Sequence, residues 1–200
     1  RKLNISIINN IDLMAERIIF LGTAGDSEVV AKQILSSGGI ILQTGSNQFL
    51  LDPGPGCLIR AKQYDVNLRE NTAVFVTHNH LGHCGDINAA MSATTLGGLD
   101  KKAVIVGSTN VFEQAEGMTP FLNPYYKTYA ERCIALTPKK KIGINEVEVH
   151  ALTAEHDEPT AIGFKFFMPN YTVTYTGDTK YFKGMETEYK NTDILIVNMQ

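Results

Sequence analysis

Residues 77–83 of the chain read THNHLGH, and this stretch decides the fold and the site that we expect. It holds three of the five histidines in the 200 residues. The apolar run Ala73–Val76 before it predicts a buried strand, and a helix is expected after it. A loop at the end of a strand can direct His78 and His80 to one side, with His83 turning in from the helix. Imidazole is the commonest zinc ligand and also suits iron and nickel, so the stretch predicts a metal site.

A surface cluster of histidines is the alternative interpretation of this stretch. Histidine-rich tracts of that kind are usually exposed and of low complexity, whereas THNHLGH lies within core-like sequence. The metal-site interpretation is therefore the stronger one.

Strands and helices alternate along the rest of the chain, and some strands also pair as hairpins. Residues 107–131 mix Gly, Pro and three tyrosines, and we expect them to form helix and loop along one side of a pocket. This pattern predicts a mixed α/β fold with two sheets. The expected strands are Arg17–Leu21, Gly39–Gln43, Gln48–Leu51, Ala73–Val76, Ala103–Val106, Glu146–Leu152, Gly163–Phe167, Tyr171–Thr176 and Ile194–Val197, and the expected helices are Cys57–Tyr64 and Ile87–Thr94, the latter capped by Asp86.

Composition excludes several classes of protein. A hydrophobic fraction of 44% and a charged fraction of 20% are ordinary for a soluble globular domain. Lys and Arg number 18 against 21 Asp and Glu, and this net charge of -3 argues against a general polyanion-binding surface. The three cysteines form no CxxC pair, which predicts reduced thiols in a cytoplasmic protein. No apolar run is long enough to span a membrane, so we expect no membrane partner.

The two ends of the chain differ from the middle. We interpret residues 1–13 as a leader, an upstream translation or a cloning remnant, and residues 14–200 as one domain. The apolar run Ile194–Val197 predicts a strand that needs cover on both faces. We therefore expect the domain to be incomplete at its C-terminus, and we expect a homodimer or aggregate if these residues are the whole protein.

Five segments, taken in order, resemble the metallo-β-lactamase superfamily, and within it the branch of tRNA 3′-processing endonucleases (tRNase Z) and small phosphodiesterases. THNHLGH is similar to the HxHxDH signature of that superfamily. The resemblance spans about residues 17–198 and implies an αββα four-layer sandwich. The other segments that carry it are FLGTAG at 20–25, DPGPG at 52–56, His156 with AIGF at 161–164, and YTGDT at 175–179.

The resemblance also implies a site for two cations. His78, His80 and His156 would hold the first cation. His83, the aspartate of the signature and a later histidine would hold the second, with Asp178 bridging the two. The implied cofactor is one or two zinc ions, with manganese or iron as alternatives. A hydroxide formed from water between the cations would attack phosphorus or a carbonyl carbon, which makes Asp178 and His83 the candidate catalytic residues.

Two departures from the superfamily pattern bear on function. Gly82 stands where the signature has its aspartate, and the last histidine of these 200 residues is His156. The second site keeps only His83 and Asp178, so we expect one cation to bind tightly and the other weakly.

Three functions remain open. The leading one is a metal-dependent hydrolase that acts on a phosphodiester or another small ester-like substrate, either a small molecule or a nucleotide-like one. Asn198 stands where the endonucleases carry a glutamate, which favours a small-molecule substrate. The second is a catalytically impaired metal-binding protein, because of Gly82. The third is an iron-dependent oxidoreductase on the same fold, since the ligand set accepts iron.

Other polar residues near these motifs take plain structural interpretations. His150 is expected to face solvent beside Glu148, and Cys84 to be a buried thiol rather than a ligand. Asp86 is expected to cap a helix, with a part in the second site as the alternative, and Lys139–Lys141 to form a solvated turn. Asp157 and Glu158 either orient His156 or are exposed loop charges.

Overall fold

The computed structural model describes residues 14–24, 27–115 and 117–199, so the interpretation of residues 1–13 lies outside the described part. The first sheet has the strand order β1-β2-β3-β4-β5-β6. Strands β1 to β3 pair antiparallel, and β3 to β6 pair parallel. Their bounds are Met14–Phe20 (β1), Ile40–Gly45 (β2), Asn47–Leu51 (β3), Asn71–Val76 (β4), Val104–Gly107 (β5) and Arg132–Ala135 (β6).

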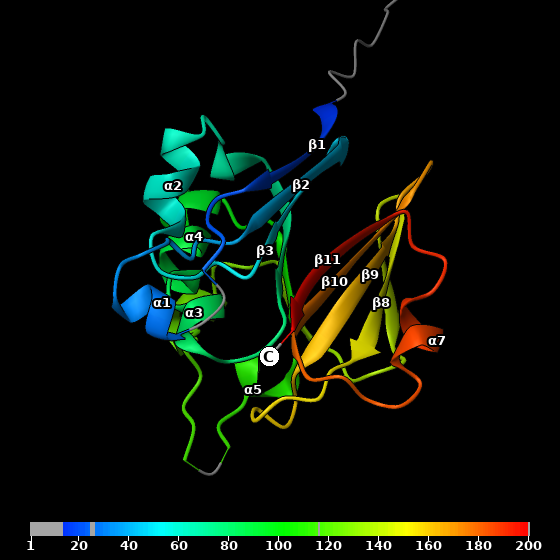
Figure 1. The fold of residues 1–200 in the computed structure, drawn as a ribbon. Coiled ribbons are helices and arrows are strands. Elements are labelled where there is room, and N and C mark those ends of the chain that lie inside the picture. The colour runs from blue at the N-terminus through cyan, green and yellow to red at the C-terminus, as the bar shows by residue number, and fades with distance from the viewer. Residues whose placement is uncertain (1–13, 25–26, 116, 200) are drawn as a thin grey trace, which may run out of the picture.

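Helices cover the outer face of this first sheet (Figure 1). The first of them lies between β1 and β2, and the others occupy the connections between the parallel strands, since parallel pairing requires a crossover. Their bounds are Ser27–Ala31 (α1), Cys57–Gln63 (α2), the 3-10 turn Leu68–Glu70 (η1), Leu81–Cys84 (α3), Ile87–Thr94 (α4), Thr109–Phe112 (α5) and Pro124–Lys127 (α6).

The second sheet faces the inner side of the first and has the order β11-β10-β9-β8-β7. Its neighbours pair antiparallel except β10 and β11, which are parallel. Helix α7 (Met185–Tyr189) lies on the outer face (Figure 1), where the Tyr189 hydroxyl donates to the Thr153 carbonyl at 2.9 Å. The strands are Lys141–Ile144 (β7), Val147–Thr153 (β8), Ile162–Phe167 (β9), Thr172–Thr179 (β10) and Ile194–Met199 (β11).

Two apolar cores hold these layers together. One core lies between the sheets and includes Phe49, Phe75, Phe164 and Phe166. Their rings meet at centroid distances of 4.9 to 6.1 Å. The other core joins the first sheet to its helices and includes Leu50 and the other outward-facing residues of the parallel strands. The order helix, sheet, sheet, helix is the predicted αββα sandwich, so the predicted fold class is confirmed.

The expected strands and helices are present, with ends displaced by at most a few residues. One prediction about a helix end is wrong. Asp86 occupies the position before α4 but makes no capping hydrogen bond with its side chain. Its Oδ2 accepts from the backbone N–H of Gly56 at 2.9 Å, because the 52–56 loop lies beside it and offers a competing donor. Asp86 therefore ties that loop to the start of α4.

The last strand, β11, lies at the edge of the second sheet with only β10 beside it. Ile194, Leu195 and Val197 have 39%, 49% and 49% of their surface exposed. Among the described residues, these side chains form an exposed apolar patch along the edge strand. In the part of the chain that is described, no helix has the length and apolar character needed to cross a membrane.

The inter-sheet core yields a prediction about stability. Phe75 is fully buried and contacts three other phenylalanine rings. Phe75→Ala should lower the free energy of unfolding by about 3–5 kcal/mol, through lost transfer energy and the cavity left behind. Urea unfolding followed by circular dichroism measures this loss. Phe167→Ala is the control, because Phe167 is only partly buried, and equal losses in the two variants would contradict the role assigned to this core.

Candidate metal centre

Strand ends deliver the candidate ligands to one edge of the two sheets. His78 and His80 follow the carboxyl end of β4, and His83 lies in the short helix α3 that comes next. His156 lies in the loop between β8 and β9, and Asp178 lies near the end of β10. Three of these side chains therefore come from the first sheet and two from the second. All five residues predicted from the sequence are brought together.

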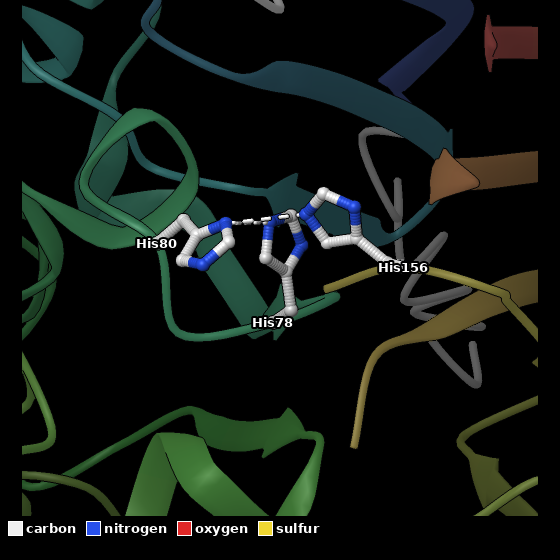
Figure 2. Close-up of side chains that lie close together, drawn as sticks. All are labelled: His78, His80 and His156. Carbon is white, nitrogen blue, oxygen red and sulfur yellow. Dashed lines mark hydrogen bonds between the residues drawn. The ribbon is translucent and has the colours of Figure 1, made fainter. Parts of the chain in front are cut away.

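The first group consists of His78, His80 and His156, whose rings point toward one another (Figure 2). His78 Nε2 and His80 Nδ1 are 3.1 Å apart, and His156 Nε2 lies 3.2 Å from the same His80 Nδ1. The ring centroids are 4.7 to 5.0 Å apart, with steep angles between the ring planes. Three imidazole nitrogens thus converge from two sheets.

These distances fit a bound cation. Nitrogens held tetrahedrally at zinc–nitrogen bond lengths of about 2.0–2.1 Å lie about 3.3 Å apart, close to the separations observed. The nitrogen of His80 faces two other ring nitrogens, and one proton cannot satisfy both contacts. The donor set therefore suits a cation better than a network of hydrogen bonds.

The second group consists of His78, His83 and Asp178. His83 Nε2 lies 3.1 Å from Asp178 Oδ1, while Asp178 Oδ2 lies 3.9 Å from His156 Nε2. Asp178 therefore lies between the two groups. The amide of Asn198 donates to Asp178 Oδ1 at 2.6 Å. Because His78 Nε2 already faces the first group, the second group retains His83 and Asp178 as its own donors.

Asp52 supports both groups, and it was not among the residues predicted for the site. Its Oδ2 accepts from His83 Nδ1 at 2.8 Å and from the Tyr175 hydroxyl at 2.7 Å. Thr77 donates to it twice, from the backbone N–H at 2.7 Å and from the hydroxyl at 2.8 Å. The signal that could have found it is an acidic residue directly after the buried strand β3, at the same sheet edge as His78.

These contacts set the protonation pattern of two histidines. The Thr77 hydroxyl donates its proton to Asp52, so it can only accept from His78 Nδ1, 3.0 Å away. This leaves His78 Nε2 without a proton and facing the first group. Likewise Asp52 accepts a hydrogen bond from His83 Nδ1, so that His83 Nε2 faces Asp178. Asp52 thus orients both rings, His83 directly and His78 through Thr77.

The charges around the histidines differ and shift their pKa values in opposite directions. Burial, together with the neighbouring rings of His83, His80 and His156, lowers the pKa of His78 well below its usual value. Burial also lowers the pKa of His156, against the raising effect of Asp157 and Asp178. Neutral imidazole is the form that binds a cation, so both rings are ready to bind at neutral pH.

His83 behaves in the opposite way. Burial lowers its pKa, but the carboxylates of Asp52 and Asp178 outweigh burial and raise the pKa to about 10. In the absence of a cation this ring is positively charged at neutral pH, and it lies between two carboxylates. A second cation must displace that proton to bind.

The position that a side chain of residue 82 would occupy is open space. A Cβ atom built on it would meet nothing within 4 Å. A cavity of about 240 Å³ opens beside it, and Asp52, His83 and Asn198 also line this cavity. By contrast, a Cβ atom on Gly54 would lie 2.0 Å from the Gly82 carbonyl oxygen, so Gly54 must remain a glycine. The 52–56 loop therefore packs directly against the backbone of residue 82, while the position of its missing side chain stays clear.

The remaining residues singled out from the sequence lie around the centre. Cys84 is buried and outside both donor groups, and burial raises the pKa of its thiol, as expected of a plain buried cysteine. His150 bonds to Glu148 through Nε2 at 2.6 Å and lies against the Phe167 ring, away from the centre. Residues 119–121 are held to the motif, because Asn79 donates to the Thr119 carbonyl and accepts from the Phe121 N–H.

The structure distinguishes between the two interpretations of Asp157 and Glu158, which were orientation of His156 and exposed loop charge. Asp157 is exposed, and its Oδ1 lies 3.0 Å from His156 Nε2. Glu158 is buried and does not bond to His156, so neither its predicted contact with that ring nor its predicted exposure is correct. Its partners are Asn110 and Thr160.

Comparison with known proteins places this geometry in a family. Residues 47–200 match the family described as "Beta-lactamase superfamily domain". An uncharacterized protein of Methanocaldococcus jannaschii is 27% identical over 93% of this chain and 70% of its own length. A UPF0173 metal-dependent hydrolase of Pyrobaculum islandicum is 33% identical over 73% of this chain and 60% of its own length. Ribonuclease Z of Methanopyrus kandleri is 25% identical over 82% of this chain and 54% of its own length.

Solved structures agree on the architecture. The metallo-β-lactamase fold protein YhfI from Bacillus subtilis has a TM-score of 0.65 and 26% identity, covering 80% of this chain and 62% of its own. Zn²⁺-bound PqqB from Methylobacterium extorquens has a TM-score of 0.66 and 11% identity, covering 89% of this chain and 71% of its own.

The chain belongs to the metallo-β-lactamase superfamily. Within that superfamily it lies near the ribonuclease Z branch. It spans between 54% and 70% of the length of the three relatives named above.

The pair Asp52 and His83 yields a prediction about pH. The folded-state pKa of His83, about 10, lies above the ordinary value of 6.5. The resulting stabilisation of the metal-free protein is complete below pH 6.5 and is lost as pH rises toward 10. Asp52→Asn removes the nearest charge and should lower the pKa of His83. An NMR titration of the histidine rings measures this shift.

The control for this titration is Tyr175→Phe. It removes one hydrogen bond to the Asp52 carboxylate but leaves the charge in place. The pKa of His83 should therefore stay high in Tyr175→Phe. If Asp52→Asn leaves the pKa unchanged, the assigned cause of the shift is wrong.

Proposed function

We propose that this chain forms the catalytic part of a metal-dependent hydrolase. The observation that carries the proposal is the convergence of the His78, His80 and His156 nitrogens, with Asp178 between them and His83. Two relatives support the proposal, one named as a metal-dependent hydrolase and the other as ribonuclease Z. The zinc-bound protein of similar fold, PqqB, supports it as well. Because the chain spans only part of these relatives, the activity of the whole protein is part of the proposal.

Zinc is the cation that we propose for the first group, with manganese or iron as alternatives. Three imidazoles and a carboxylate are a donor set that zinc accepts. A divalent cation bound there lowers the pKa of a water molecule and stabilises negative charge on a substrate oxygen. The chain supplies the rest of the chemistry through the side chains that orient these donors.

The supporting residues have separable tasks. Asp52 and Thr77 keep His78 Nε2 free of a proton, as described above. Asn198 donates to Asp178 Oδ1 and restrains the rotation of that carboxylate. His83, charged in the metal-free state, supplies a positive group facing Asp178.

The proposed substrate is a small phosphodiester or similar ester, either a small molecule or a nucleotide-like one. The cavity beside Gly82 and His83, at about 240 Å³, lies just below the usual size of ligand pockets, about 300–1,000 Å³. The net charge of -3 also gives no general attraction for a long polyanion. Both features support a compact substrate over a large folded RNA.

Gly82 supports a second candidate, a metal-binding protein with impaired catalysis. With only His83 and Asp178 as its own donors, the second group falls short of the three protein ligands that catalytic zinc sites use. The two candidates share the first cation and differ in turnover, so they can be separated by experiment.

The test of the proposed function is metal content followed by turnover. Elemental analysis of dialysed protein should find about one tightly held zinc per chain, because only the first group has enough ligands. Hydrolysis of bis(p-nitrophenyl) phosphate should stop when a chelator removes the metal and resume when zinc is returned.

Two variants check that this activity comes from the centre. His80→Ala should lower the rate by about a hundredfold or more, since losing a ligand costs at least as much as losing its supporting residue. His150→Ala is the matched control, because this histidine bonds to Glu148 away from the centre. Zinc bound without any hydrolysis would favour the impaired protein, and equal effects of the two variants would refute the site.

Gly82 yields a separate prediction. Gly82→Asp adds a Cβ atom that meets nothing within 4 Å and brings a carboxylate to the cavity that Gly82 and His83 both line. Affinity for the second cation should rise by about tenfold or more through one additional charged ligand, and turnover of the phosphodiester should rise with it. Isothermal titration with zinc measures the affinity. Gly82→Asn is the matched control of the same size without the charge. An equal gain in both variants, or no gain in either, contradicts the prediction.

A further inference from the structure

A buried carboxylate lies two residues after His156. Glu158 is 1% exposed, and Thr160 Oγ1 lies 2.9 and 3.1 Å from its two oxygens. The side-chain amide of Asn110 donates to the same carboxylate. A charge taken out of water is costly unless it is paired or hydrogen-bonded, and these donors compensate the cost. The group takes no direct part in the metal centre.

The contact between Glu158 and Asn110 joins the two halves of the molecule. Asn110 lies in α5, directly after β5 of the first sheet, and Glu158 lies in the loop between β8 and β9 of the second. Two weaker contacts run beside it. The backbone N–H of Asn110 donates to Thr160 Oγ1 at 3.2 Å, and Ser108 Oγ lies 3.2 Å from that same oxygen. Short polar contacts thus span the gap between the sheets at one point.

The loop that carries His156 is held differently at its two ends. Before His156, the bonds that Glu155 makes with described residues stay within the second half, since its N–H donates to Thr179 Oγ1 at 3.0 Å and its carbonyl accepts from the Lys180 N–H at 2.8 Å. After His156, the Glu158 cluster and the bond from Ile162 N–H to the Thr77 carbonyl, at 3.1 Å, reach the first half. The placement of His156 against His78 and His80 therefore depends on this second end.

The first group of donors needs that placement. His78 and His80 belong to the first half, whereas His156 comes from the second. Donor atoms must lie within a few tenths of an ångström of their bonding distance for a cation to be held well. A flexible loop would leave the third donor poorly placed, even in a protein that is otherwise folded.

We infer that Glu158 and Asn110 form a clamp that positions His156 where it would hold the first cation together with His78 and His80. Glu158 is a positioning residue that acts through His156. The inference rests on the proposed metal site and adds two residues to it. The cluster pairs one buried carboxylate with neutral donors, so losing a donor also costs stability. The experiment therefore measures cation affinity separately from stability.

The test exchanges the partners of the clamp and measures cobalt binding. Asn110→Asp places two carboxylates in contact, which should push the loop away and weaken cobalt affinity by about tenfold or more, as loss of a supporting partner does. The visible spectrum of bound cobalt should change as well. The double variant Asn110→Asp with Glu158→Gln restores a donor and an acceptor with the direction reversed. Its affinity should return to within about threefold of the original protein.

Thr94→Val is the control for a general loss of stability. The Thr94 hydroxyl is buried and accepts from Asn71 Nδ2 at 3.0 Å, at the opposite end of β4 from His78. This variant should lower the melting temperature and leave cobalt affinity unchanged. If Asn110→Asp behaves in the same way, with an unchanged spectrum, the clamp is refuted.

A milder variant covers the case in which Asn110→Asp does not fold. Thr160→Val keeps the shape of the side chain but removes the hydroxyl that bonds to Glu158, and cobalt affinity should fall by about threefold. An unchanged affinity in this folded variant overturns the clamp. The unmodified protein is titrated in the same series, and its failure to bind cobalt would refute the metal site itself, which distinguishes the two inferences.

Discussion

The structure around the metal centre depends on the carboxylate of Asp52. It accepts four hydrogen bonds, two from Thr77 and one each from His83 and Tyr175. Through Thr77 it reaches His78, and through Tyr175 it reaches the second sheet. Loss of any of these donors would leave the buried carboxylate partly unsatisfied, and the protein would then bear the desolvation cost of that group. The Asp52 side chain therefore holds the loop of residues 77–83, orients the rings of His78 and His83, and links this loop to β10.

The centre is also an interface between layers. The donors divide between the sheets, so the separation of the sheets decides whether the nitrogens of His78 and His156 can share a cation. The phenylalanine rings between the sheets set that separation. The bond from Ile162 to Thr77 and the Glu158 cluster then adjust it at the edge where the donors lie. Packing therefore sets the approximate separation of the two sheets, and the polar contacts adjust the distances between the donor atoms.

Much of this could be predicted from the sequence, because the strands that carry the donors are apolar runs that end at polar loops. The short strands β6 and β7 could not, since they are largely exposed and lack an apolar pattern. Asp52 resembled a turn residue in a Pro-Gly loop, because its four donors come from distant segments. For Glu158 the sequence left two interpretations, orientation of His156 or exposed loop charge, and neither could reveal its partner Asn110, which lies 48 positions away. Local pattern reveals donor types and strand ends but not partners brought close by folding.

The clear space at Gly82 has an evolutionary consequence. Glycine codons ending in a pyrimidine are separated from aspartate codons by a single base, and a Cβ atom at position 82 meets nothing within 4 Å. Gly54 lies in the 52–56 loop that packs against residue 82. It has no such freedom, because any side chain there would meet the Gly82 carbonyl. A lineage carrying this sequence can therefore gain or lose the carboxylate at position 82 repeatedly without a change of fold, provided that residue 54 remains glycine.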